Sequence, residues 1–171
     1  ICSWCKRVRM EEKHWVEIEE ALTQLKLFEL QALPNFSHGV CQDCYDTAVR
    51  YSKQRIQFGK PIGGFQLQQK KLAEMLTEIT KAQLLVWRLG QLMDKGLATP
   101  AQISMAKRNN VEIALTTARE ARQMLGGMGI TGEFPIMRHM MNLESVVTYE
   151  GTHDIHLLIL GMEITGENAF V

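Results

Sequence analysis

Two long stretches with apolar residues at helical spacing limit the possible folds of this chain more than any other feature. Residues 67–92 and residues 99–125 each carry apolar side chains three or four positions apart. This spacing places one apolar stripe along a helix, whereas a half-buried strand needs a period of two. Because few β-branched residues alternate with polar ones anywhere in the chain, the sequence predicts an all-α body.

Gly and Pro mark the expected helix boundaries, and shorter helices are predicted at 45–55, 135–142 and 154–164. In Thr99-Pro100-Ala101-Gln102, an N-cap Thr followed by Pro and Gln predicts the start of the second long helix. Gly126-Gly127-Met128-Gly129 predicts its end. Short links between such helices favour an antiparallel four-helix-bundle type of domain. The expected inward stripes are Leu72, Met75, Leu76, Ile79, Ala82, Gln83 and Val86 on the first long helix, and Ile103, Ala106, Ile113, Ala114, Ala118 and Ala121 on the second.

The charge balance argues against partners that bind through bulk charge. The chain has 19 Lys and Arg against 19 Asp and Glu, so neither nucleic acid nor a membrane surface is an expected partner. No apolar run approaches the roughly 18–20 residues of a membrane-spanning helix. Residues 2–9 lack the apolar core of a signal peptide, and a cytoplasmic protein is expected. Since the chain begins with Ile1, we expect a fragment or a fusion.

The four cysteines form two pairs with the same spacing, Cys2-x-x-Cys5 and Cys41-x-x-Cys44. In a cytosolic chain this pattern indicates a metal site rather than disulfides. Four thiolates can surround zinc tetrahedrally, and His38 is a rival for the fourth position. Unligated reduced thiols and a redox pair are the alternatives.

The cysteines also divide the chain. Residues 1–44 are expected to form a Cys-rich, zinc-binding module, with one helix at 15–30 between the two pairs, and residues 45–171 to form the helical domain.

Tyr149-Glu150-Gly151-Thr152-His153-Asp154 is the string with the clearest chemical potential. It places an acidic residue in a Gly-containing turn before a helix. One interpretation is an ordinary turn with Thr152 or Asp154 as the N-cap. The other is a carboxylate held against a substrate as a general base, and spacing alone leaves both open.

Three motifs resemble the acyl-CoA dehydrogenases in their order and spacing. Tyr149-Glu150-Gly151-Thr152 resembles the catalytic loop of that family, Arg55-Ile56-Gln57-Phe58-Gly59 resembles its Arg-x-x-Phe-Gly turn, and Gln123-Met124-Leu125-Gly126-Gly127-Met128-Gly129 resembles its Gln-x-x-Gly-Gly-x-Gly segment. The strings at 107–110, 142–144 and 153–156 are more similar to the glutaryl-CoA branch. The resemblance covers residues 45–170 and implies the C-terminal helical domain with a truncated first helix.

The resemblance implies FAD-dependent α,β-dehydrogenation of an acyl-CoA, with glutaryl-CoA as substrate and decarboxylation to crotonyl-CoA. Glu150 would take the α-proton, and Tyr149 and Gly151 would line the acyl pocket. The β-hydrogen would pass to the flavin, because no side chain accepts a hydride. The other domains of the family are missing, so the chain alone is expected to be inactive.

The same resemblance implies the cofactor contacts. Arg55 would reach the pyrophosphate of an FAD held by a neighbouring subunit, which suits a planar bidentate cation. Phe58 would pack by the adenosine end, Gln66, Gln123 and Gly127 would touch the dinucleotide, and Thr152 and Asp154 would lie near the flavin. Taken alone, Arg55 is a solvated helix-end cation and Gly126-Gly127 a helix C-cap.

The implied partners are further copies of the chain, as a dimer or tetramer, and an electron-transfer acceptor protein. The bundle is expected to bring Glu150 and the glycines at 126–129 to one rim.

Residues 1–44 resemble a short cysteine module found on bacterial sensor kinases and response regulators, although Gln42 stands where Pro usually follows the third Cys. This resemblance implies a bacterial protein. Two further functions stay open from the sequence. One is a non-catalytic, zinc-stabilised binding or signalling module. The other is a remnant that only packs against other helices.

Overall fold

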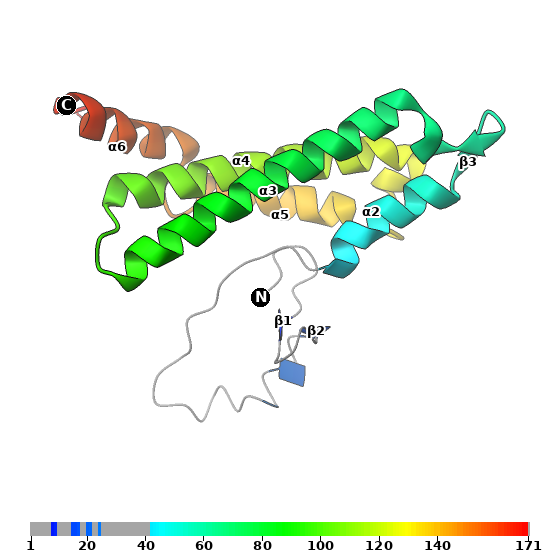
Figure 1. The fold of residues 1–171 in the computed structure, drawn as a ribbon, viewed down its shortest axis with the longest axis horizontal. Helices are drawn as coiled ribbons and strands as arrows, with labels where there is room; N and C mark the ends of the chain where they lie inside the picture. The colour runs from blue at the N-terminus through cyan, green and yellow to red at the C-terminus, as the bar shows by residue number, and fades with distance from the viewer. Residues whose placement is uncertain (1–7, 10–14, 18–19, 22–23, 25–41, 171) are drawn as a thin grey trace.

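The computed structural model describes residues 8–9, 15–17, 20–21, 24 and 42–170 (Figure 1). Helices dominate this part of the chain, which confirms the predicted all-α class. They are α2 (Gln42–Gln54), α3 (Gln66–Asp94), α4 (Pro100–Met124), α5 (Ile136–Thr148) and α6 (His153–Thr165), with two 3-10 turns, η3 (Ile62–Gly64) and η4 (Gly126–Ile130). Two-residue strands form two antiparallel hairpins, β1 (Val8–Arg9) with β2 (Trp15–Val16), and β3 (Ile56–Gln57) with β4 (Lys60–Pro61).

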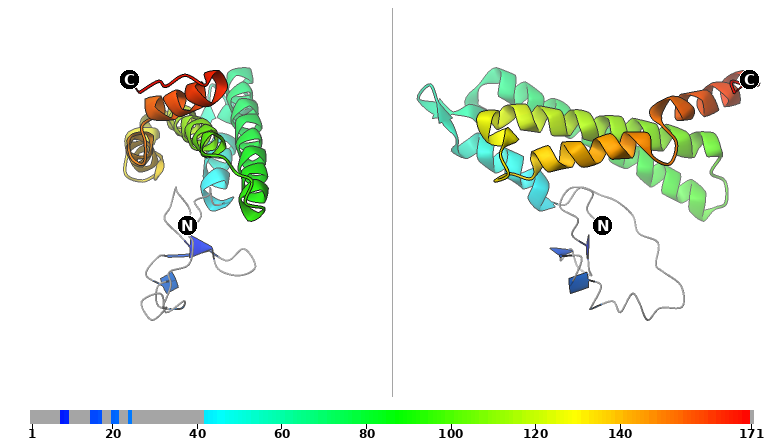
Figure 2. Two further views of the ribbon diagram at one scale, coloured as in Figure 1. Left: turned by 90° about the vertical axis from the view of Figure 1, so that its left-hand side faces the viewer. Right: turned by 180° about the vertical axis from the view of Figure 1, so that it is seen from behind.

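Helix α4 lies at the centre of the bundle and packs along α3, α5 and α6 (Figures 1 and 2). One core cluster joins Leu115 and Ala118 of α4 to Leu143 of α5, and a second surrounds Ala121 and Leu125. Small side chains on α4 let the neighbouring helices approach closely. Burial of apolar surface at these contacts is the main force that holds the bundle together.

The start of α4 has the capping box that the sequence predicts. The hydroxyl of Thr99 accepts a hydrogen bond from the Gln102 backbone amide at 3.3 Å, and the Gln102 side-chain oxygen accepts one from the Thr99 amide at 3.0 Å. Two amides that the first turn would otherwise leave unpaired are satisfied in this way. The helix ends at Met124, directly before the predicted glycine stop.

The predicted inward stripes are only partly right. Met75 is buried, but Leu76, Gln83 and Val86 are exposed, and so is Ile103 on α4. The reason is that α3 packs mainly on α4 along its length, so its buried face is narrower than the apolar stripe in the sequence.

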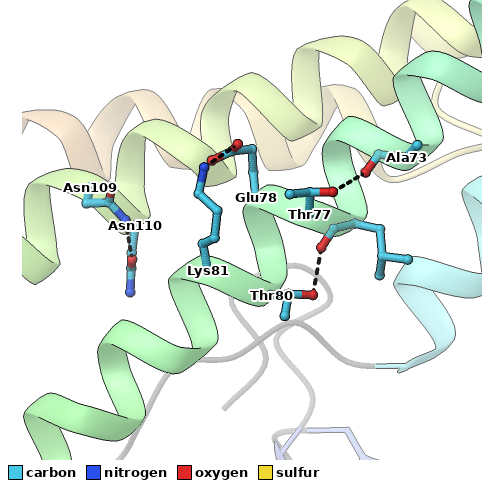
Figure 3. Close-up of polar contacts among 8 residues, drawn as sticks. Ala73, Thr77, Glu78, Thr80, Lys81, Asn109 and Asn110 are labelled. Atoms are coloured by element: carbon cyan, nitrogen blue, oxygen red, sulfur yellow. Dashed lines mark hydrogen bonds and ion pairs between the residues drawn. The ribbon is translucent and has the colours of Figure 1, made fainter.

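Polar groups on the open side of α3 bond within their own helix (Figure 3). The hydroxyl of Thr77 donates to the Ala73 carbonyl and that of Thr80 to the Leu76 carbonyl, each at 2.8 Å. Lys81 pairs with Glu78 at 2.6 Å. These local contacts satisfy the polar groups and leave the apolar side chains of this face without cover from the described chain.

Two helix boundaries and one hairpin differ from the sequence-based expectation. Helix α5 continues to Thr148, six residues past the predicted end at residue 142, because Leu143 is packed against α4. Trp15 and Val16 pair with Val8 and Arg9 as a strand, so no helix begins at residue 15. The β3–β4 hairpin was not expected, since two-residue strands leave almost no alternating pattern in a sequence.

The predicted zinc site falls outside the residues that can be described. Cys2, Cys5, His38 and Cys41 lie beyond the described ranges, and of Cys44 only the backbone is described. Among the described residues, no group of three or more His, Cys, Asp or Glu side chains is placed to hold a metal ion. The described helices include none that is both long and apolar enough to cross a membrane. The division at residue 44 and the cysteine module stay predictions.

Candidate functional site

The loop between α5 and α6, residues 149–152, has a constrained backbone. Glu150 has a φ of +55° and Gly151 a φ of +93°. An L-residue with a large side chain rarely adopts the left-handed region, and holding one there costs on the order of 1–3 kcal/mol. The Glu150 side chain is exposed. A strained backbone under an exposed carboxylate is typical of a functional site rather than of a plain turn.

Lys107, from the second turn of α4, holds this loop. Its ammonium donates hydrogen bonds to the carbonyls of Tyr149 and Gly151, each at 2.5 Å. The same ammonium lies 6.0 Å from the centroid of the Tyr149 ring. Burial lowers the pKa of Lys107, while the nearby charge of Glu150 opposes that shift. The loop is therefore bonded to a residue more than 40 positions away in the sequence.

His156 packs beneath the loop from the first turns of α6. A Cβ atom placed on Gly151 would lie 3.0 Å from two atoms of its ring, so this contact fits glycine only. The imidazole is buried. Burial lowers its pKa, and the positive charge of Lys107 lowers it further, against smaller opposing contributions from the backbone of Gly151 and Glu150. His156 is thus a neutral support for the loop near pH 7.

Thr152 and Asp154 start α6. The Thr152 hydroxyl accepts a hydrogen bond from the Ile155 amide at 3.4 Å, which makes Thr152 the N-cap. Asp154 lies in the first turn, where the helix dipole favours a negative charge. Thr152 and Asp154 thus lie where the loop joins α6, and their contact with a flavin stays a prediction.

The β3–β4 hairpin presents Phe58 at its tip. Phe58 and Gly59 both have positive φ, +50° and +79°, which is the geometry of a two-residue hairpin turn. The Phe58 side chain is 93% exposed, and its ring meets the edge of Phe65 at a centroid distance of 6.2 Å. An aromatic side chain held outward at a strained position indicates a surface that binds something else.

Arg55 stands at the base of this hairpin. When the Gln57 amide is oriented with its oxygen towards Arg55, that oxygen accepts from the guanidinium Nε at 3.2 Å and Nη2 at 2.7 Å. The Arg55 carbonyl accepts from the Ile62 amide at 2.8 Å, which closes the hairpin. A planar cation is thereby oriented on an exposed side chain, as a phosphate-binding arginine needs to be.

The start of α3, the end of α4 and η4 lie at the same end of the bundle as the hairpin (Figures 1 and 2). These elements carry Gln66, Gln123 and Gly127, respectively. Lys71 donates to the side-chain oxygen of Gln123 at 2.6 Å and pairs with Glu120 at 2.7 Å, which ties α3 to α4. A Cβ atom on Gly127 would meet nothing within 4 Å, so this backbone borders open space. We call Arg55, Phe58, Gln66, Gln123 and Gly127 the hairpin end.

The hairpin end and the 149–152 loop lie at opposite ends of α4. Lys107, which binds the loop, and Gln123 are 16 residues apart on this helix, about 24 Å at 1.5 Å per residue. The expectation that Glu150 and the glycines at 126–129 share one rim is wrong, because the 13 residues of α5 run back along α4 before the loop begins. One chain therefore carries two separate clusters.

Sequence reasoning did not single out Lys107 or His156 as supports of the loop. Both residues lie within the strings at 107–110 and 153–156, which predict a branch of the family and no contact with the loop. Their contacts depend on how α4 meets the α5–α6 link, which helical spacing alone does not specify.

The described helical bundle thus has a carboxylate on a strained loop at one end, and a cation, an aromatic ring and amides at the other. The family model described as the acyl-CoA dehydrogenase C-terminal domain matches residues 24–165. The chain belongs to the acyl-CoA dehydrogenase family.

Individual relatives agree with this assignment. The chain is 37% identical over 123 residues to the short-chain specific acyl-CoA dehydrogenase of Megasphaera elsdenii, which covers 72% of this chain and 32% of that protein. A crystal structure of glutaryl-CoA dehydrogenase from Mycobacterium smegmatis matches with 53% identity and a TM-score of 0.73, over 75% of this chain and 33% of that one. A second structure of a glutaryl-CoA dehydrogenase from that organism, in complex with FADH2, matches with 47% identity, a TM-score of 0.73 and the same two shares. The chain spans about a third of the length of these relatives.

Proposed function

We propose that this chain is the catalytic-base domain of an FAD-dependent acyl-CoA dehydrogenase, with Glu150 as the base. The observation that carries the proposal is the left-handed backbone of Glu150, which is clamped by Lys107 and packed on His156 through a glycine. A turn without a function would not need this support, since a glycine in place of Glu150 would remove the strain.

The chemistry calls for a carboxylate of this kind. The α-proton of a thioester is weakly acidic, and its removal needs a base that is already oriented towards it. The Glu150 carboxylate accepts this proton and becomes the neutral acid. When bound, FAD supplies the acceptor for the β-hydrogen and its electron pair. Tyr149 and Gly151 line the acyl group, while Thr152 and Asp154 lie towards the flavin.

The side chains at the hairpin end fit a dinucleotide. Arg55 offers a planar cation to a pyrophosphate, and Phe58 offers an exposed ring to the adenosine. Gly127 borders open space, so a phosphate or ribose can approach the backbone there.

The distance of about 24 Å along α4 between the two clusters favours an assembly of at least two copies. In that assembly the hairpin end of one copy would hold the FAD, and Glu150 of another copy would face the substrate. A dimer or tetramer meets this condition, and an electron-transfer acceptor protein is the proposed further partner.

Glutaryl-CoA is the proposed substrate. The strings at 107–110, 142–144 and 153–156 support it, as do the glutaryl-CoA dehydrogenases from Mycobacterium smegmatis among the similar structures. For this substrate, loss of carbon dioxide follows the α,β-dehydrogenation and yields crotonyl-CoA. The rival is a short straight-chain acyl-CoA, which the similarity to the short-chain enzyme supports.

The base assignment is tested in a completed enzyme. Residues 45–170 replace the corresponding C-terminal third of the Mycobacterium smegmatis glutaryl-CoA dehydrogenase, and crotonyl-CoA formation is followed. Glu150→Gln should lower kcat by about 10²- to 10⁴-fold, because an amide cannot accept the α-proton. Glu163→Gln, an exposed position on α6, is the matched control and should keep the parent rate. Full turnover by the Glu150 variant would remove the assignment.

A further inference from the structure

The geometry points to Lys107 as the positioning residue for Glu150: its ammonium clamps the two carbonyls that flank Glu150 and so fixes the direction of the carboxylate. This inference rests on the proposed role of Glu150. Lys107 itself touches no reacting atom, because its hydrogen bonds go to the main chain of the loop.

Two carbonyls of the loop converge on the Lys107 ammonium. Tyr149 and Gly151 lie on either side of Glu150, and in an extended chain the carbonyls of residues i and i+2 cannot meet at one atom. They meet at the Lys107 ammonium because Glu150 has a φ of +55° and Gly151 a φ of +93°. The clamp and the left-handed backbone are therefore two aspects of the same geometry.

The local contacts of the loop differ from this clamp. Glu150 lacks the short side chain with which Asn or Asp stabilises the left-handed region. Thr152 is engaged as the N-cap of α6, and its hydroxyl accepts from Ile155. The His156 ring packs against Gly151 and interacts with the backbone of Gly151 and Glu150, whereas Lys107 donates hydrogen bonds to both carbonyls that flank Glu150.

The hydrogen-bond partners of Lys107 differ from those of other lysines on the bundle. Lys70, Lys71 and Lys81 pair with the carboxylates of Glu74, Glu120 and Glu78 on helix surfaces. Lys107 instead donates to main-chain oxygens 42 and 44 residues away. Hydrogen bonds from an ammonium to carbonyls are stronger than those between neutral groups, and the Glu150 carboxylate adds an attraction for the same ammonium.

The test uses the 171-residue chain in solution, without flavin or thioester. The intraresidue NOE between the amide and Hα protons of Glu150 is strong only when φ is positive, so it reports the clamped backbone directly. Four proteins are compared: the parent, Lys107→Met, Lys107→Arg and Lys71→Met. Lys71 also joins two elements, which makes its variant the matched control.

The strong NOE should disappear in Lys107→Met while circular dichroism shows unchanged helix content. It should persist in Lys71→Met and return in Lys107→Arg, which restores a cation with several donors. A Lys107→Met protein that keeps the NOE overturns the inference. If that variant does not fold, the exchange of ammonium protons with water is measured in the parent protein. The protons of Lys107 should exchange more slowly than those of exposed Lys70, and equal rates overturn the inference.

These outcomes are independent of the proposed function. The NOE and the exchange rates are measured without turnover, whereas the base assignment depends on the Glu150→Gln rate in the completed enzyme. If the NOE shows a clamped loop but Glu150→Gln leaves the rate unchanged, the catalytic role of Glu150 is excluded. The contact between Lys107 and the loop would still stand.

Discussion

Gly151 is the residue on which the loop depends most directly. Its φ of +93° is unfavourable for any side chain, and a Cβ atom there would press on the buried ring of His156. Gly151→Ala should therefore lower the free energy of unfolding by about 1–3 kcal/mol. Denaturant unfolding of the chain measures this loss.

Gly161 is the control for that substitution. It lies in α6, and a Cβ atom there would meet nothing within 4 Å. Gly161→Ala should raise the free energy of unfolding by roughly 0.5–1 kcal/mol, because alanine favours the helix. Equal effects of the two substitutions would contradict the tight packing between Gly151 and His156.

His156 should make the stability of the chain sensitive to mild acid. Its pKa in the folded chain is lowered from 6.5, mainly by burial. As the pH falls through about 6.5, the unfolded chain binds a proton that the folded chain does not, so the free energy of unfolding decreases until the lower folded pKa is reached. Thermal unfolding between about pH 7.5 and about pH 5.5 should show a smaller loss of Tm for His156→Gln than for the parent. Parallel losses would exclude this contribution.

At the scale of helices and turns, the passage from α4 to η4 is tightly packed at Gly129. A Cβ atom on Gly129 would fall well inside contact distance of the Arg122 carbonyl oxygen, which belongs to the helix backbone and cannot move away. Gly129→Ala should thus cost more than about 2 kcal/mol of stability. Denaturant unfolding of the chain measures this cost.

Gly127 provides the contrast in the same turn. A Cβ atom there meets open space, so Gly127→Ala should change the free energy of unfolding by less than about 0.5 kcal/mol. In the completed enzyme, the same substitution should weaken FAD retention. A large loss of stability at Gly127, or none at Gly129, would be inconsistent with this turn geometry.

The elements that the sequence predicted well are those with a local physical cause. Helix α4 begins at Thr99-Pro100 because a capping box needs only four consecutive residues, and it ends before Gly126 because the left-handed φ of +58° there suits glycine. The end of α5 was misplaced because its last turns depend on contacts with α4. The β3–β4 hairpin was missed because its signal is a turn with a left-handed Phe, which propensity alone disfavours.

The candidate site likewise contains residues that a short motif predicts and a residue that no local pattern predicts. Motif resemblance predicts Glu150, Arg55 and Phe58 as site residues, since each lies in a short string of fixed spacing. It did not identify Lys107, whose hydrogen bonds join residues 42 and 44 positions apart. A contact of this range depends on the crossing of helices, and one sequence does not contain that information.

At the scale of the whole molecule, the separation of the two clusters predicts complementation between copies. In the completed enzyme, copies with Glu150→Gln and copies with Arg55→Ala should each be nearly inactive. A mixed dimer has one site with both residues intact, so random mixing should restore about a quarter of the parent activity. Crotonyl-CoA formation after co-refolding measures this recovery. If both residues serve one site from the same copy, mixing restores nothing.

Apolar side chains are exposed on several helices of the bundle. Leu84 and Trp87 on α3 and Ile164 on α6 lie open in the described chain. A soluble domain rarely exposes so much apolar surface unless it meets another surface. Such exposure agrees with the proposal that other domains and further copies normally cover this bundle.

Helix α4 also sets the distance between the two clusters. Its unbroken turns between Lys107 and Gln123 set both the spacing and the angular phase of the two clusters. One residue added within this stretch would move one cluster by about 1.5 Å and rotate it by about 100° around the axis relative to the other. Insertions and deletions can be absorbed in the links at 95–99 or 131–135, whereas the proposed assembly requires the length of this segment to match the reach of a ligand bound between adjoining copies.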